Sequence, residues 1–183
     1  MNDSIAPDLS ADYRQSSFRE KMLEHVFVAE LLQEAWFRCG RTLEVLHSEV
    51  DSSGYDVVLE FNGVIRHAQL KSSREGATTA VLPINTALAT KPSGCVVWMF
   101  YSRQPGAHRA HLSYRFFGGR PGEPLPSLGD RVAKHTKANA EGVKLPRPGI
   151  RVIGKADFSP VMDLPALMDR LFGPVAILKE SAR

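Results

Sequence analysis

One dipeptide constrains the fold of this chain more than any other feature: Asn62-Gly63 lies between two alternating runs in residues 54–73, GYDVVLEFNGVIRHAQLKSS. A two-residue type I′ turn needs positive φ at both central positions, which asparagine and glycine adopt readily. The pattern therefore predicts a β-hairpin whose register is fixed by the turn. Counting back from the turn places Asp56 directly opposite Gln69.

The predicted register sorts the hairpin into a polar and an apolar face, because successive side chains of a strand point to opposite sides. Asp56, Gln69 and Lys71 share the polar face at the end away from the turn. Glu60 and His67 lie on the same face nearer the turn, where exposure to solvent explains them. The other face is apolar enough to pack against a helix or another layer.

A long helix is predicted from Ser17 to Cys39, before the hairpin. Ser17 and Glu20 have the spacing of a capping box, and Gly40 supplies a stop. At 100° per residue, Glu24 falls on the apolar stripe of this helix. The other patterns predict strands at 42–46, 78–84, 95–101, 109–117 and 150–153, and helices at 85–90, 130–140 and 164–172.

The elements together predict an α/β fold in a single domain, since 183 residues are too few for two large cores. Residues 1–16 are expected to form a flexible arm. The domain, residues 17–183, divides into a core over 17–101 and a basic C-terminal extension over 102–183. Neither a secretory signal nor a membrane span is recognisable in the sequence, so a cytoplasmic protein without membrane contact is expected.

Glu24 on a first helix, Gly54-Tyr55-Asp56 opening a strand and Gln69-Leu70-Lys71 on its partner resemble the PD-(D/E)xK nuclease superfamily. The resemblance covers roughly residues 17–101 and implies a restriction-endonuclease-like mixed β-sheet, flanked by helices, with the site on the antiparallel hairpin. Gln69 stands where many members carry an acid. This Gln-x-Lys variant resembles Mrr-type restriction enzymes and phage-defence nucleases, which implies a role in defence or DNA processing.

The resemblance also implies roles for each residue of the site. Asp56 is the central ligand of Mg²⁺ or Mn²⁺, Gln69 and the main-chain carbonyl of Leu70 are further oxygen ligands, and Glu24 completes the site. Lys71 orients the attacking water or stabilises developing charge. The chemistry suits these residue types, because Mg²⁺ prefers hard oxygen ligands and needs only one or two carboxylates. Cleavage of a phosphodiester requires an activated water and neutralised phosphoryl charge.

The charge distribution supports a polyanionic partner. Residues 1–60 carry 12 acidic and 5 basic side chains, whereas residues 101–155 carry 3 acidic and 11 basic ones. Such a basic segment is typical of proteins that follow a nucleic-acid backbone, and DNA is the expected partner. The candidate contacts are Lys134, Lys137, Lys144, Arg147 and Arg151.

Several alternatives remain open from the sequence alone. Asp56 and Gln69 could form a hydrogen-bonded pair at the rim of a sheet. Lys71 could be an exposed charge at a sheet edge. Glu24 could be a helix residue near the N-terminus, where the helix dipole favours acids. The basic segment also suits a solvated surface. The whole chain also suits an inactive nuclease-fold subunit that binds nucleic acid or a partner, and a homodimer or a protein partner at residues 102–183 stays open.

Overall fold

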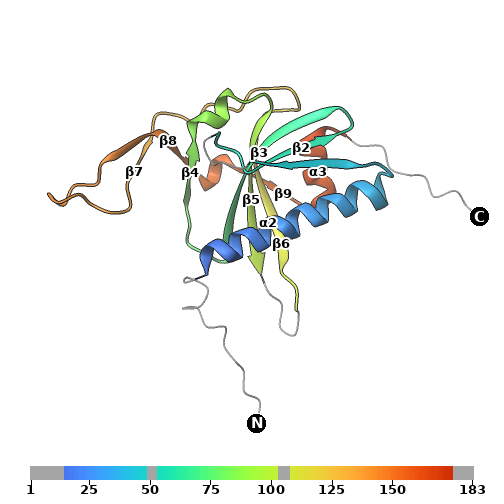
Figure 1. The fold of residues 1–183 in the computed structure, drawn as a ribbon, viewed down its shortest axis with the longest axis horizontal. Helices are drawn as coiled ribbons and strands as arrows, with labels where there is room; N and C mark the ends of the chain where they lie inside the picture. The colour runs from blue at the N-terminus through green and yellow to red at the C-terminus, as the bar shows by residue number, and fades with distance from the viewer. Residues whose placement is uncertain (1–14, 49–52, 103–107, 175–183) are drawn as a thin grey trace, which may run out of the picture.

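The structure is a computed structural model that describes residues 15–48, 53–102 and 108–174 (Figure 1). Within these ranges it is a mixed α/β fold with a large, mostly antiparallel sheet and two α-helices. The helical segments are α2 (Ser16–Gln33), the π-helical turn η1 (Glu34–Arg38), the 3₁₀ turns η2 (Thr86–Thr90) and η3 (Lys155–Asp157), and α3 (Leu164–Phe172). The strands are β1 (Leu43–His47), β2 (Val57–Phe61), β3 (Val64–Arg74), β4 (Val81–Asn85), β5 (Gly94–Ser102), β6 (His111–Gly118), β7 (Val132–Lys134), β8 (Pro146–Gly154) and β9 (Ser159–Val161).

The predicted hairpin is confirmed. Asn62 and Gly63 have φ values of 54° and 77°, as a type I′ turn requires. Antiparallel pairing of β2 with β3 begins at Phe61 opposite Val64. The register is the one that the turn predicts.

A six-stranded sheet surrounds this hairpin in the order β1-β2-β3-β5-β6-β9. Strands β3 and β5 are parallel, and the other neighbouring pairs are antiparallel. The connection between the parallel strands carries β4 and η2, which leave the sheet and cover one of its faces. A second sheet, in the order β4-β8-β7, is built on this connection.

Strand β5 explains how the two sheets and the helices form one body. Its apolar run is buried on both sides, with alternate residues belonging to different cores. Cys95, Val97 and Met99 face the core under α2 and α3, while Val96 and Trp98 face the second sheet. Both α-helices therefore pack on the same face of the six-stranded sheet, and strands cover the other face.

A buried arginine joins the hairpin to the last helix. Arg66 is fully buried in β3 and donates hydrogen bonds to the carbonyl oxygens of Leu171 at 2.6 Å and of Arg170 and Gly119 at 2.9 Å each. The first two carbonyls belong to the last turn of α3, whose C-terminal carbonyls lack partners within the helix. Burial lowers the pKa of Arg66. One guanidinium thus fixes the end of α3 against the sheet.

Two local predictions are wrong. The first helix begins at Ser16 after Gln15 and has no side-chain cap, so the predicted capping box of Ser17 and Glu20 does not form. Residues 130–140 are not helical: they contain β7 and then turns, because β7 pairs with β8 across the loop formed by residues 135–145. Strand pairing here overrides the local helical preference.

The packing of Gly54, two residues before Asp56, can be tested against that of Gly63. Both glycines have a φ of +77°, but their surroundings differ. A Cβ on Gly63 would meet nothing within 4 Å, whereas one on Gly54 would lie 2.9 Å from the Leu88 backbone nitrogen. We expect Gly63→Ala to lower the free energy of unfolding by about 1 kcal/mol through backbone strain. Gly54→Ala should cost roughly 3 kcal/mol, because overpacking adds to that strain. Urea denaturation measures both, and equal losses would contradict the close approach of residue 54 to η2.

Candidate functional site

Asp56 stands directly before β2, and its carboxylate is held by the partner strand. Regular pairing ends at Val57 opposite Ala68, one step before the expected opposition of Asp56 and Gln69. Instead, the Asp56 amide donates to the Ala68 carbonyl at 3.0 Å, and Asp56 Oδ2 accepts the Leu70 amide at 2.6 Å. The Asp56 carboxylate thus accepts a hydrogen bond from the Leu70 amide, which has passed the last residue of β2 and would otherwise lack a partner on that strand.

The geometry of Leu70 follows from this bond. In a β-strand the N–H and C=O groups of one residue point to the same side, as the paired bonds of an antiparallel ladder require. The Leu70 amide meets Asp56, so the Leu70 carbonyl is directed to the same side of β3. Asp56 and the main chain of Leu70 therefore lie together at the end of the hairpin.

Gln69, like Arg66, is a buried polar side chain of β3. It is only 5% exposed, and Oε1 has no hydrogen-bond partner among the described residues. Its neighbour Ala68 faces the core under the helices, so Gln69 is directed to the second sheet, beside Val96 of β5. Leaving a buried polar atom unpaired costs about 1 to 3 kcal/mol. Such an atom is suited to a ligand that the protein itself does not supply.

Lys71 lies two residues further along β3, on the same face. It is half-buried and stands beside Trp98 in the register with β5. The indole of Trp98 is fully buried and donates to Ser73 Oγ at 3.0 Å. Within the described part of the chain, no hydrogen bond or ion pair engages the Lys71 ammonium group, so its charge is available to a bound anion.

Glu24 approaches the same end of the sheet from α2, which packs on the face opposite to Gln69 and Lys71. It is 7% exposed, on the stripe where the helical pattern predicts it. Lys21 Nζ contacts both carboxylate oxygens at 2.9 Å, and His47 Nδ1 lies 3.2 Å from Oε1. His47 ends β1 opposite Val57, and the next amide, that of Ser48, donates to the Asp56 carbonyl at 3.4 Å.

Glu24 is thus connected to the Asp56 segment through His47 and Ser48. His47 was missed by sequence reasoning, although a signal was present. Leu43, Val45 and His47 alternate along β1, so a strand extended by one residue would have placed the imidazole on the side of α2.

The donor set at the hairpin suits a hard divalent cation. Within the described ranges, no three His, Cys, Asp or Glu side chains come together to hold a metal ion. Mg²⁺ needs fewer, because it usually keeps several waters and takes one or two carboxylates. The Asp56 carboxylate, the unpaired Gln69 carbonyl oxygen and the Leu70 carbonyl are all oxygen ligands of the required kind.

The predicted nucleic-acid contacts fall on one feature, the β7–β8 hairpin with its connecting loop (residues 131–151), here called the basic arm. Figure 1 shows β7 and β8 extending away from the six-stranded sheet. Inside the loop, the Asn139 side chain accepts the Val143 amide at 2.8 Å, and the His135 amide bonds to the Leu145 carbonyl at 2.9 Å. Four of the five predicted contacts are exposed and the fifth is half-buried: Lys134, Lys137, Lys144 and Arg147, and Arg151 respectively.

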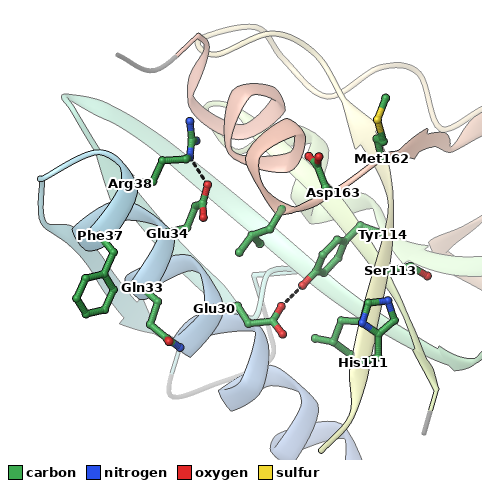
Figure 2. A pocket seen from close by; sticks show the side chains of 12 residues that line it. Glu30, Gln33, Glu34, Phe37, Arg38, His111, Ser113, Tyr114, Met162 and Asp163 are labelled. Atoms are coloured by element: carbon green, nitrogen blue, oxygen red, sulfur yellow. Dashed lines mark hydrogen bonds and ion pairs between the residues drawn. The ribbon is translucent and has the colours of Figure 1, made fainter. Parts of the chain in front are cut away.

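A large pocket lies elsewhere, between α2, β6 and the start of α3 (Figure 2). It has a volume of about 690 Å³, within the usual range for ligand pockets. Its polar groups largely satisfy one another: Tyr114 donates to Glu30, Arg38 pairs with Glu34, and Asp163 caps α3. Burial and the bond to Glu30 raise the pKa of Tyr114, so the phenol stays protonated.

Comparisons of this chain with protein-family models, with curated proteins and with solved structures found no match. The resemblance to PD-(D/E)xK nucleases stays a prediction from the sequence. Neither described helix is sufficiently long and apolar to cross a lipid bilayer.

The unpaired oxygen of Gln69 can be tested without any ligand. Gln69→Met replaces the buried amide with an apolar side chain of similar length, so it should raise the free energy of unfolding by about 1 kcal/mol or more. Gln33→Met, at an exposed position of α2, is the control and should change stability by less than about 0.5 kcal/mol. Thermal unfolding in the presence of a chelator measures both. A loss of stability in Gln69→Met would mean that the amide has a partner within the protein.

Proposed function

We propose that this protein is a cytoplasmic, metal-dependent nuclease that hydrolyses phosphodiester bonds, with DNA as its substrate. The observation that carries the proposal is the group at the end of the hairpin. Asp56, directly before β2, supplies a carboxylate bound to the Leu70 amide, while alternate residues of β3 supply the buried Gln69 oxygen and the Lys71 ammonium group, neither of which has a partner among the described residues. Two free, buried cysteines, Cys39 and Cys95, suit a reducing compartment.

The metal ligands proposed are Asp56, Gln69 and the Leu70 carbonyl, with Glu24 joining directly or through water. A bound Mg²⁺ or Mn²⁺ lowers the pKa of a coordinated water and neutralises phosphoryl charge. Asp56 supplies the central negative charge, and the Leu70 amide fixes its orientation. The amide oxygen of Gln69 adds no charge, so we expect weaker metal binding than a second carboxylate would give.

Lys71 acts on the phosphate. Its half-buried position, beside the closed core around Trp98, reduces the solvent screening of its charge. An ammonium group held there stabilises negative charge that develops during cleavage or orients the attacking water. The lack of a partner among the described residues keeps it available for this role.

The basic arm supplies the affinity for the nucleic-acid backbone. Contacts with phosphates are independent of sequence and release counterions, so they weaken as salt rises. The arm carries seven exposed or half-buried Lys, Arg and His side chains over residues 131–151, against one acid, Glu141. We therefore expect the arm to bind DNA of any base sequence, through contacts with phosphates rather than with bases.

Loss of Asp56 and loss of Lys71 should have different effects. Asp56→Ala should abolish both Mn²⁺ binding and cleavage, because the central ligand is gone. Lys71→Ala should retain or tighten Mn²⁺ binding and lose roughly 100-fold or more in cleavage rate. Gln69→Glu should tighten Mn²⁺ binding by adding a charge. Titration calorimetry and cleavage of plasmid DNA, linear DNA and RNA with Mg²⁺ or Mn²⁺ measure these effects.

Glu60→Gln is the matched control, since Glu60 is a half-buried carboxylate on β2 nearer the turn. It should bind Mn²⁺ and cleave like the parent protein. Unchanged Mn²⁺ binding in Asp56→Ala would reject the metal site. Nucleic-acid binding without cleavage by the parent protein, under every metal condition, would favour an inactive nuclease-fold subunit instead.

Charge reversal in the basic arm should weaken binding broadly. Lys137→Glu and Arg147→Glu should each lower affinity for DNA of any sequence and reduce the slope of log K against log salt by about 1. Arg120→Glu, which reverses an exposed charge outside the arm, should leave the slope unchanged. Fluorescence anisotropy between 50 and about 200 mM salt measures the slope. Parent-like affinity in both arm variants would assign residues 131–151 to a protein interface.

A further inference from the structure

A lysine outside the hairpin rests on two aromatic rings beside the candidate site. Lys155 opens the 3₁₀ turn η3, and its Nζ lies 4.9 Å from the centre of the Phe100 ring and 5.9 Å from that of the Trp98 ring. Both distances are within the range over which an aromatic ring attracts a cation. Lys155 is also half-buried, so its ammonium group is held close to the sheet.

Main-chain contacts fix the position of Lys155. Its amide donates to the Ala80 carbonyl at 2.8 Å. Arg115 lies beside Trp98 in the register of β5 with β6. The Arg115 guanidinium donates to the carbonyl oxygens of Lys155 at 3.3 Å and of Phe158 at 3.1 Å. The turn η3 is therefore anchored without any use of the Lys155 ammonium group.

The same two rings are flanked by side chains of β3. Lys71 stands beside Trp98 in the parallel register, and Ser73 stands beside Phe100. The indole of Trp98 leans toward β3, because its Nε1 donates to Ser73 Oγ at 3.0 Å. Lys71 and Ser73 are alternate residues, so both point to the side of the sheet that carries the rings. Lys155 thus approaches the rings from η3, while Lys71 and Ser73 approach them from β3.

Each of these three side chains has a donor left for a ligand. Within the ranges that the structure describes, neither Lys71 nor Lys155 forms an ion pair with an acid. Asp157, in the same turn as Lys155, accepts the Gly154 amide at 3.0 Å instead. The Ser73 hydroxyl accepts the indole hydrogen bond, which leaves its own proton to be donated. Two positive charges and a hydroxyl donor therefore gather without a counter-charge among these residues.

This group of donors suits a phosphate. Two ammonium groups on neighbouring elements repel one another where they are half-buried, and an anion between them removes that repulsion. A phosphate group offers several acceptor oxygens, so it can accept hydrogen bonds from two elements at once. Lysine is a common phosphate ligand, and hydrogen bonds between charged groups are stronger than neutral ones.

We propose that Lys155, Ser73 and Lys71 form a second phosphate site, which binds the DNA phosphate next to the one being cleaved. The inference rests on the nuclease function proposed above and adds Lys155 and Ser73 to its substrate contacts. Along β3, the side chains of Gln69, Lys71 and Ser73 follow one another in steps of about 6.6 Å. The proposed metal lies at Gln69, so the reacting phosphate lies between Gln69 and Lys71. The next phosphate lies one step further, at Ser73 and Lys155.

Lys155 also connects the candidate site with the basic arm. It directly follows β8, whose other end belongs to the arm. Arg147 and Arg151 of β8 precede it at intervals of four residues. In Figure 1, β8 leads from the arm toward the six-stranded sheet. Basic side chains therefore occur all the way from the arm to the site, as a DNA strand bound to both requires.

DNA binding without cleavage is the first test. Lys155→Met removes the ammonium group but keeps an unbranched side chain against the rings. It should lower the affinity for duplex DNA by roughly 10-fold and the slope of log K against log salt by about 1. Lys155→Arg keeps the charge and should keep the slope. Arg170→Met removes an exposed cation of α3, on the other face of the sheet, and should bind like the parent protein. Fluorescence anisotropy with a chelator present measures all four proteins.

Cleavage kinetics separate the role of Lys155 from that of Lys71. A contact with the neighbouring phosphate is equally strong before and during the reaction. Lys155→Met should therefore raise KM for DNA by roughly 10-fold and leave kcat within about twofold of the parent value. Lys71→Ala should instead lower kcat. A lower kcat with unchanged KM in Lys155→Met would place Lys155 at the reacting phosphate and overturn the second phosphate site.

The two assays distinguish failure of this inference from failure of the nuclease proposal. Parent-like affinity and salt slope in Lys155→Met would overturn the second phosphate site and leave the nuclease intact. A reduced slope in Lys155→Met, with no cleavage by the parent protein under any metal condition, would support the phosphate contact of Lys155 and reject the nuclease. A parent protein that binds no DNA would overturn both.

Discussion

The turn at Asn62-Gly63 is the constraint on which the rest of the structure depends. It fixes the register of β2 against β3, and β3 then pairs with β5 on its other side. The register decides that Arg66 and Ala68 point to the helices, while Gln69 and Lys71 point to the second sheet. A slip of one residue would exchange the two sets. One turn therefore decides which residues of β3 pack under the helices and which face the second sheet with the candidate site.

Local patterns predicted the elements whose partners are adjacent in sequence or whose burial is strongly periodic. The hairpin, α3 and the buried strand β5 belong to this class. The second sheet could not be predicted in the same way, because β4 pairs with β8 about 70 residues later. Residues 130–140 lack a strong apolar period, and the pairing with β8 gives only Val132–Lys134 a strand conformation. Long-range pairing leaves little trace in a short window of sequence.

The candidate site, like the fold, could be predicted only in part from the sequence. The register alone brings Asp56, Gln69 and Lys71 into one region, so counting residues from the turn was sufficient to choose them. The contacts that hold them were not predictable, because they use main-chain groups at a strand end, as in the bond between Asp56 and Leu70. The unpaired oxygen of Gln69 also has no local signature. This oxygen is buried without a partner among the residues that the structure describes, at a cost in stability that the proposed metal site would explain.

The buried guanidinium of Arg66 has a consequence for the order in which the chain folds. Arg66 lies early in the sequence, but two of the three carbonyl groups that accept its hydrogen bonds belong to residues more than a hundred positions later. During synthesis on the ribosome, the hairpin emerges long before α3. Until α3 arrives, closing the helix-side core would bury a cation with few partners. The hairpin can form early, but its helix-side core can close only after residue 171 has been synthesised. Folding of this core therefore waits until most of the domain has been made.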